Sequence, residues 1–265
     1  MGVFQLRINM VTKYNILGVP IHNLSYKEVE TLLTGWLTQG ETVFHQIVTT
    51  NPEFIMEAQK NEQFRAVLQA AALSLADGFG IACASLFVYR KPIERITGVQ
   101  ATFVLCGLAQ KYDKKVFLLG ALPGVAEKCA QELRKRFSKL NIVGAEEGIP
   151  VGNEKFNSIL NQEICQRITE SQTDILLVAY GAPKQELWIS QYKSKLPSVC
   201  ITMGVGGTFD YIAGVIPYSP AFFRTLGLEW LFRLFVEPKR AKRIFTAVIC
   251  FPAAVFWYKL KSIVN

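Results

Sequence analysis

Apolar runs alternate with amphipathic stretches along most of the chain. Four segments repeat one pattern, in which an apolar strand ends in glycine or small polar residues and a turn or helix follows: TVFHQIVTTNPEF, KVFLLGALPGVAEKCAQELRKRF, DILLVAYGAPKQELW and VCITMGVGGTFDYIAG. In the first segment we expect a strand over residues 43–48, ended by residues 49–52. In the second, Val125, Cys129, Leu133 and Phe137 recur every four residues, which predicts a helix.

Continuous apolar strands between amphipathic helices are typical of a parallel sheet that is covered on both faces. We therefore predict a Rossmann-like α/β domain over residues 1–218, with a mostly parallel sheet. Ligands of such sheets bind beyond the carboxyl ends of the strands, where helix N-termini point. The residues expected at that edge are Thr49, Asn51, Gly120, Gly181, Gln185, Gly204, Gly206, Gly207 and Asp210.

The pattern changes in residues 219–265, which are basic and rich in aromatic side chains. Residues 244–258 include only Thr246 and Pro252 outside the hydrophobic class. A straight helix of this length would reach about 22 Å, short of the roughly 30 Å hydrocarbon core, and Pro252 would disturb it. We therefore expect an appendage that lies in the membrane interface without crossing the bilayer. The alternative is a helical pair packed on the main domain with a solvated basic face.

The net charge of +8 is concentrated in this appendage. Residues 219–265 hold eight basic and two acidic residues, a net +6, so the first 218 residues carry only +2. A basic tail on a nearly neutral body indicates an anionic partner, which could be a membrane surface, a nucleic acid or a phosphate group.

Cysteine spacing and the N-terminus indicate a cytosolic protein. The six cysteines are scattered without a CxxC pair, as expected for reduced core thiols. Polar residues interrupt the first 13 positions before an apolar run can build, so we expect no signal peptide.

The sequence lacks most of the residues that several common catalytic and metal-binding sites require. It holds two histidines, no Walker A motif and no pair of aspartates at DxD spacing. Histidine-centred metal sites and Ser-His-Asp catalysis are therefore disfavoured. A bound diphosphate would have to be neutralised by arginine, lysine, backbone amides and helix dipoles.

One acidic residue, Asp77, stands in the apolar stretch SLADGFGI, residues 74–81. Asp-Gly is a common turn signal, so a structural turn is one interpretation. The loops GALPG and GVGG could approach a pyrophosphate, but neither has GxGxxG spacing. A nicotinamide-dependent oxidoreductase remains an alternative, because Glu146 or Glu147 follows the first loop roughly where a ribose-binding acid would lie.

Five motifs occur in a fixed order: TTNPEF, ADGFGI, RITG, GAPKQE and GVGGTFD. Together they resemble the WecG/TagA/CpsF family of bacterial glycosyltransferases, from about residue 15 to residue 243. The resemblance implies transfer of an N-acetylmannosamine-type sugar from a UDP donor to N-acetylglucosamine on polyprenyl diphosphate, in cell-surface polysaccharide or teichoic acid synthesis. It also implies inversion at the anomeric carbon, no cofactor, no metal ion and no nucleic-acid partner.

The resemblance also implies roles for individual residues. Asp77 matches the family's proposed general base, and Arg95, which matches the arginine of its RxTG motif, is the second catalytic candidate. Thr49, Asn51 and Gln185 match substrate-binding positions. The tail arginines Arg233, Arg240 and Arg243 are similar in placement to those thought to complete the site at the inner face of the membrane. Structural alternatives are strand ending for Thr49 and Asn51, helix capping for Gln185 and Glu186, and a turn for Asp210. The sequence leaves a homo-oligomer open.

The chemistry of sugar transfer is consistent with such a site. A sugar hydroxyl is a weak nucleophile at neutral pH, so a carboxylate that accepts its proton lowers the barrier. An apolar loop would raise the pKa of Asp77 by desolvation and make it a stronger base. Arginines and oriented amides would stabilise the charge that grows on departing UDP.

Overall fold

The computed structural model describes residues 11–40, 42–148, 154–217, 219–220, 222–223 and 227–264. Residues 1–10, which carry most of the segment considered above as a signal peptide, lie outside the described residues, as do residue 218 at the expected domain boundary and Arg224 of the basic tail.

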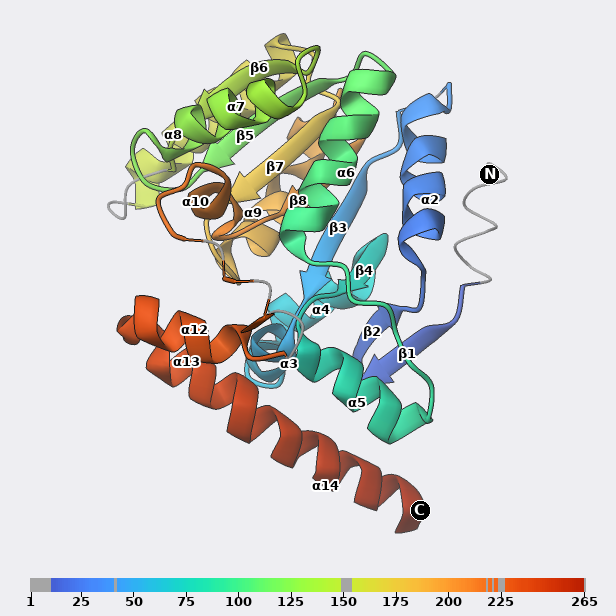
Figure 1. Cartoon of the computed structure of the whole chain (residues 1–265). Helices are drawn as coiled ribbons and strands as arrows, with labels where there is room; N and C mark the ends of the chain where they lie inside the picture. The colour runs from blue at the N-terminus through green and yellow to red at the C-terminus, as the bar shows by residue number, and fades with distance from the viewer. Residues whose placement is uncertain are drawn as a thin grey trace.

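A parallel sheet forms the centre of the described chain (Figure 1). Its order is β4-β3-β8-β7-β5-β6, and every neighbouring pair is parallel. The strands are β3 (His45–Thr50), β4 (Leu73–Ala76), β5 (Lys115–Gly120), β6 (Asn141–Glu146), β7 (Ile175–Ala179) and β8 (Ile201–Gly204). The predicted Rossmann-like parallel sheet is confirmed.

Alternate strand residues pack against opposite helical layers, because successive side chains of a strand point to opposite faces. On β5, Val116 and Leu118 belong to the core on one face, while Phe117 and Leu119 belong to the core on the other. The first core includes residues of α2 (Tyr26–Thr38), α6 (Gly98–Lys111) and α7 (Val125–Arg136). The second includes residues of α8 (Glu154–Glu170) and α9 (Lys184–Tyr192). Continuous apolar strands are therefore buried on both faces.

A third apolar cluster lies beside β3 and β4. It joins the antiparallel hairpin of β1 (Lys13–Ile16) and β2 (Val19–His22) to α3 (Pro52–Ala58), α4 (Glu62–Ala70) and α5 (Phe79–Tyr89). Phe251 and Val255 of the C-terminal helix are buried in the same cluster. The C-terminal segment is thus packed onto the sheet domain by apolar side chains.

The first strand, expected over residues 43–48, begins and ends two residues later, at His45 and Thr50. Thr49 and Thr50 lie inside β3 and pair with Leu75 and Ala76 of β4. Thr50 Oγ1 lies 2.8 Å from the hydroxyl of Ser74, and β-branched threonine suits a strand. The strand therefore ends just before Asn51, whose side chain caps α3 by accepting the Phe54 N–H at 3.0 Å.

Four cysteines are buried as expected, Cys106, Cys129, Cys165 and Cys200, whereas Cys83 is exposed and Cys250 is half-buried. All six are free thiols.

The C-terminal helices lie below the arrowheads of the central strands in Figure 1. They are α12 (Glu229–Val236), α13 (Ala241–Phe245) and α14 (Phe251–Val264), with a 3-10 turn at Pro238–Arg240 and a π-helical turn at Thr246–Cys250.

The helical run is longer than the sequence pattern indicated. Residues Ala241–Lys261 form one helix of 21 residues, long and apolar enough by length and composition to cross a membrane. At about 1.5 Å per residue it reaches roughly 31 Å. The expected length of about 22 Å is too short, because the helix continues past both ends of the apolar stretch. Pro252 lies inside this helix, just after the π-helical turn at Thr246–Cys250. Only 17% of the most apolar window of this helix is buried.

Candidate functional site

A polar cavity of about 160 Å³ lies at the carboxyl ends of β3, β4, β7 and β8. The predicted site residues that line it are Thr49, Asn51, Asp77, Gly181, Gln185, Gly206, Gly207, Arg233, Arg240 and Arg243. The strands place the first seven, and the C-terminal helices bring the three arginines over them. We call this space the polar cavity.

Asp77 directly follows β4 and faces the N-terminus of α6. Its Oδ2 accepts the backbone N–H of Gly98 at 3.3 Å, and Thr97 caps the helix in a capping box with Gln100. A Cβ atom added at Gly98 would lie 3.2 Å from Thr208 Oγ1, 3.7 Å from Thr49 Oγ1 and 4.0 Å from Asp77 Oδ2. Three oxygen atoms therefore converge at this helix end, where the helix dipole favours negative charge.

Burial raises the pKa of Asp77 from 3.8 to about 6. The charge of Arg233 opposes this shift most strongly, followed by the hydrogen bond from Gly98. Glu229 raises the pKa further, and Arg95 lowers it. A carboxyl group with this pKa is ionised at neutral pH and is a stronger base than an exposed aspartate, as a general base requires.

The three tail arginines line the polar cavity together with two glutamates, Glu53 and Glu229. Arg243 Nε donates to Glu53 Oε2 at 2.6 Å, and Arg240 Nε lies 2.9 Å from Glu237 Oε1. The guanidinium carbon of Arg233 lies 5.3 Å from the centre of the Tyr211 ring. Guanidinium groups are well suited to phosphate oxygens, so these arginines can hold an anionic ligand.

Gln185 and Glu186 form a buried pair behind the cavity. Gln185 Oε1 accepts the backbone N–H groups of Gly181 and Gly206, both at 3.0 Å, and its Nε2 donates to Glu186 Oε1 at 2.7 Å. The side chain of Gln185 therefore ties together the loops that follow β7 and β8. Burial raises the pKa of Glu186 to about 7, and its Oε2 has no hydrogen-bond partner among the described residues. The alternative of helix capping is not observed, since Pro183 is the N-cap and no side chain caps α9.

Four predicted residues do not line the polar cavity in the described part of the chain: Arg95, Gly120, Gly204 and Asp210. Gly120 has a φ of +111°, and an added Cβ atom would lie 2.8 Å from the carbonyl carbon of Ala179. Gly204 leaves room for the Gln185–Glu186 pair. These two glycines therefore allow close packing behind the site.

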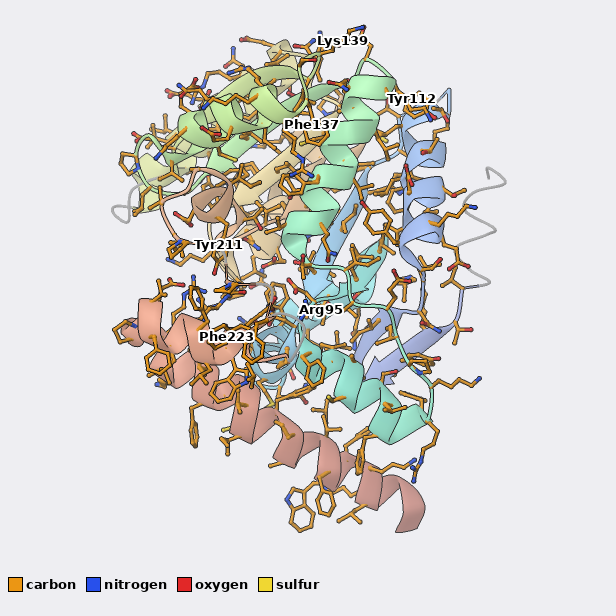
Figure 2. The ribbon with its side chains drawn as sticks, viewed as in Figure 1. Arg95, Tyr112, Phe137, Lys139, Tyr211 and Phe223 are labelled. Carbon is orange, nitrogen blue, oxygen red and sulfur yellow. The ribbon has the colours of Figure 1, made fainter. Side chains whose placement is uncertain are left out.

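Asp210 and Arg95 lie near the cavity but have protein neighbours. Asp210 belongs to α10 (Thr208–Ile212); burial raises its pKa, and Arg240 partly opposes the shift. Both Arg95 guanidinium NH2 groups bond to the Glu229 carboxylate at 3.4 Å. Figure 2 shows Arg95 and Tyr211 close to α12, on its sheet side. Arg95 thus links the loop before α6 to the appendage.

Sequence reasoning missed several residues of the cavity lining: Glu53, Thr97, Thr208, Tyr211, Ser219 and Glu229. Thr97 has a local signal, since a Thr-x-x-Gln capping-box pattern begins in the RITG motif and ends at Gln100. Glu53 and Glu229 have none, because their importance depends on arginines far away in the sequence.

The two acids considered for ribose binding lie elsewhere. Glu146 accepts two hydrogen bonds from Arg167, at 2.9 and 2.8 Å. Glu146, Glu147, Gly124 and Arg167 line a separate cavity beside α7 and α8. This location does not coincide with the polar cavity at Asp77.

A second cavity, of about 530 Å³, opens beside the polar cavity. We call it the apolar groove. Its walls come from α5 and the C-terminal helix, and it includes Phe79, Ala84, Phe87, Ile244, Val248, Phe251, Val255 and Phe256. The lining residues common to both cavities are Asn51, Glu53, Asp77, Glu229 and Arg233. The two spaces therefore meet at Asp77.

Comparison with known proteins shows which family and which relatives this chain resembles. A family model described as "Glycosyl transferase WecG/TagA/CpsF family" matches residues 14–264. A protein of Bacillus spizizenii, named N-acetylglucosaminyldiphosphoundecaprenol N-acetyl-beta-D-mannosaminyltransferase, is 31% identical over 231 residues, which cover 85% of this chain and 86% of that protein. The family match includes the C-terminal helix, so it extends beyond the residue 243 limit inferred from the motifs.

Proposed function

Since the chain belongs to the WecG/TagA/CpsF family and is a glycosyltransferase, we propose that it transfers an N-acetylmannosamine-type sugar from a UDP donor to N-acetylglucosamine on polyprenyl diphosphate. The observation that carries this proposal is the carboxylate of Asp77 at the meeting point of a polar, arginine-lined cavity and an apolar groove. The name of the Bacillus spizizenii relative supplies the sugar and the acceptor class.

In the proposed reaction, Asp77 accepts the proton of the acceptor hydroxyl while the oxygen of that hydroxyl attacks the anomeric carbon. The bond from this carbon to the UDP oxygen breaks, and UDP leaves with the electron pair. Thr49, Asn51 and the backbone of Gly206 and Gly207 would hold the donor at the strand ends. The side chain of Gln185 fixes these loops, and Arg95 positions Glu229 and the appendage.

Arginines take the place of a metal ion in this proposal. The guanidinium groups of Arg233, Arg240 and Arg243 line the cavity and would neutralise the diphosphates of donor and acceptor. The relative's product is β-linked by its name. From an α-linked UDP donor a β product requires inversion, which a single displacement with one base achieves.

We also propose that residues 219–265 form a membrane-binding appendage on the catalytic domain of residues 1–218, at the cytoplasmic face of the membrane. Large side chains of the C-terminal helix are exposed, among them Phe245 at 58% and Trp257 at 62%. Such a surface beside Lys259 and Lys261 suits insertion into a lipid interface.

The proposed function is tested by incubating the purified full-length protein with a lipid-linked N-acetylglucosamine diphosphate and a series of UDP-sugars. We expect release of UDP and a disaccharide-lipid with N-acetylmannosamine-type donors, at rates that EDTA does not lower. Absence of transfer from all UDP-sugars would refute the proposal, and loss of activity in EDTA would refute its metal-free mechanism.

The pH dependence of transfer should report on Asp77. Because the base must be deprotonated, kcat/KM is expected to rise as pH increases through about 6, the pKa of Asp77. Arg233→Ala removes the charge that most strongly lowers this pKa, so the rise should move to higher pH. Arg65→Ala, which affects an exposed pair with Glu62 on α4, is the control and should leave the profile in place. An unchanged profile in Arg233→Ala would contradict the assignment of the base.

A further inference from the structure

We propose that the apolar groove between α5 and the C-terminal helix binds the first isoprene units of the acceptor's polyprenyl chain. This inference rests on the proposed function, because it assumes an acceptor whose diphosphate is attached to such a chain. It adds a site for the lipid tail that is separate from the site of sugar transfer.

The apolar groove continues from the polar cavity. The polar cavity and the apolar groove share Asp77, Glu229 and Arg233 among their lining residues. A ligand with an acceptor sugar at Asp77 and a diphosphate beside Arg233 would therefore direct its next atoms into the groove. The groove's volume of about 530 Å³ falls within the roughly 300–1,000 Å³ typical of small-molecule sites.

The walls of the groove are mostly apolar. Helix α5, with the sequence FGIACASLFVY, holds no charged residue. It faces Ile244, Phe251 and Val255 across the groove, and these side chains are buried. An isoprenoid chain is branched and apolar, so it gains free energy by leaving water for such a surface.

The groove leads to an exposed apolar surface. Its lining residues Phe79, Phe87 and Phe256 are 51%, 45% and 49% exposed, and Trp257, next to Phe256, is 62% exposed. Figure 1 shows α5 and α14 side by side at the edge of the molecule. A polyprenyl chain could pass from Asp77 along the groove to this exposed apolar surface, where the remainder of the chain would enter the bilayer.

Charge at the inner end of the groove favours this occupant over an acyl chain of a bilayer lipid. Arg233 lines the shared mouth, and Arg240 and Arg243 line the polar cavity next to it. The glutamates at the mouth, Glu53 and Glu229, form salt bridges with Arg243 and Arg95. Together the three cavity-lining arginines match a diphosphate at the start of an apolar chain. An acyl chain that entered from the membrane would bring no diphosphate to this end.

The test uses acceptors with the same N-acetylglucosamine diphosphate head and tails of increasing length, from a short soluble alkyl group to several isoprene units. Full-length Ala247→Trp places a large ring in the groove lining, where Ala247 is half-buried. Full-length Ile249→Trp is the matched control, because Ile249 lies in the same π-helical turn but is exposed and is not part of the groove lining.

For the unmodified protein in detergent-free buffer, we expect kcat/KM to rise at least about tenfold with tail length, the equivalent of burying about two CH₂ groups. Ala247→Trp should lose most of this increase while it keeps its activity on the short-tail acceptor. Ile249→Trp should keep both. If Ala247→Trp still turns over the short-tail acceptor, this variant is folded, and the proposed function holds independently of the groove.

Two outcomes would overturn the inference. One is that the unmodified protein turns over the short-tail acceptor but its kcat/KM does not rise with longer tails. The groove would then bind a bilayer acyl chain or a second copy of this chain. The other is an equal response of Ala247→Trp and Ile249→Trp to tail length. Absence of turnover with every acceptor would instead refute the proposed function, on which the inference depends.

Discussion

Asp77→Asn is expected to lower kcat/KM for transfer by about 10²–10⁴-fold, the typical contribution of a general base. Asparagine has nearly the same shape and can still accept the Gly98 N–H that Asp77 accepts at 3.3 Å, but it cannot take a proton from a hydroxyl. Initial rates with the UDP donor and the lipid-linked acceptor measure the loss, and a titration with UDP shows whether donor binding survives.

The stability of this variant separates loss of chemistry from loss of fold. The folded-state pKa of about 6 lies above the ordinary value of 3.8, so the ionised carboxylate is disfavoured in the folded protein at neutral pH. Asp77→Asn removes that charge and should leave the melting temperature at pH 7.5 unchanged or slightly higher. Asp113→Asn is the control, since Asp113 is exposed in a left-handed turn at φ 52° that asparagine also tolerates. Near-normal turnover in Asp77→Asn would exclude Asp77 as the base.

The sheet could be predicted because its signals are local. Each buried strand appears in the sequence as an apolar run, and glycine, proline or asparagine marks its end. The strand ends meet at one edge in any parallel sheet, which is why Thr49, Asn51, Gln185 and Gly206 were expected together and line one cavity. The short strand β4, which places Asp77 at the same edge, was not predicted.

The parts that could not be predicted depend on contacts between distant segments. The salt bridges Arg95–Glu229 and Arg243–Glu53 join residues that are 134 and 190 positions apart. Neither glutamate has a local pattern that distinguishes it from a solvated charge. The apolar groove likewise requires α5 and the C-terminal helix to face each other, and each helix alone resembles an ordinary core segment. The length of the C-terminal helix was missed because Pro252 was expected to disturb it, whereas the helix continues through Pro252, with a π-helical turn at Thr246–Cys250 just before it.

Gly204→Ala is expected to reduce both stability and transfer, because the glycine borders the buried pair that holds the site's loops. A Cβ atom added at Gly204 would lie 2.5 Å from Glu186 Oε1, 2.6 Å from Gln185 Nε2 and 2.8 Å from Gln185 Cγ. Both side chains are almost fully buried, so neither can move into solvent. Overpacking of this kind costs about 1–3 kcal/mol. At about 2–4 °C per kcal/mol for a chain of this size, calorimetry should show a melting temperature lower by about 2–12 °C.

The same substitution should also raise the KM for the UDP donor. Displacing Gln185 weakens its hydrogen bonds to the backbone N–H groups of Gly181 and Gly206, and the loops that hold these groups line the polar cavity. The control is Gly40→Ala, because a Cβ atom added at Gly40 meets no atom within 4 Å, so its stability and KM should match those of the unmodified protein. A Gly204→Ala protein with normal stability and a normal donor KM would show that the Gln185–Glu186 pair can shift without cost. In that case Gln185 would not be the element that fixes the donor-binding loops.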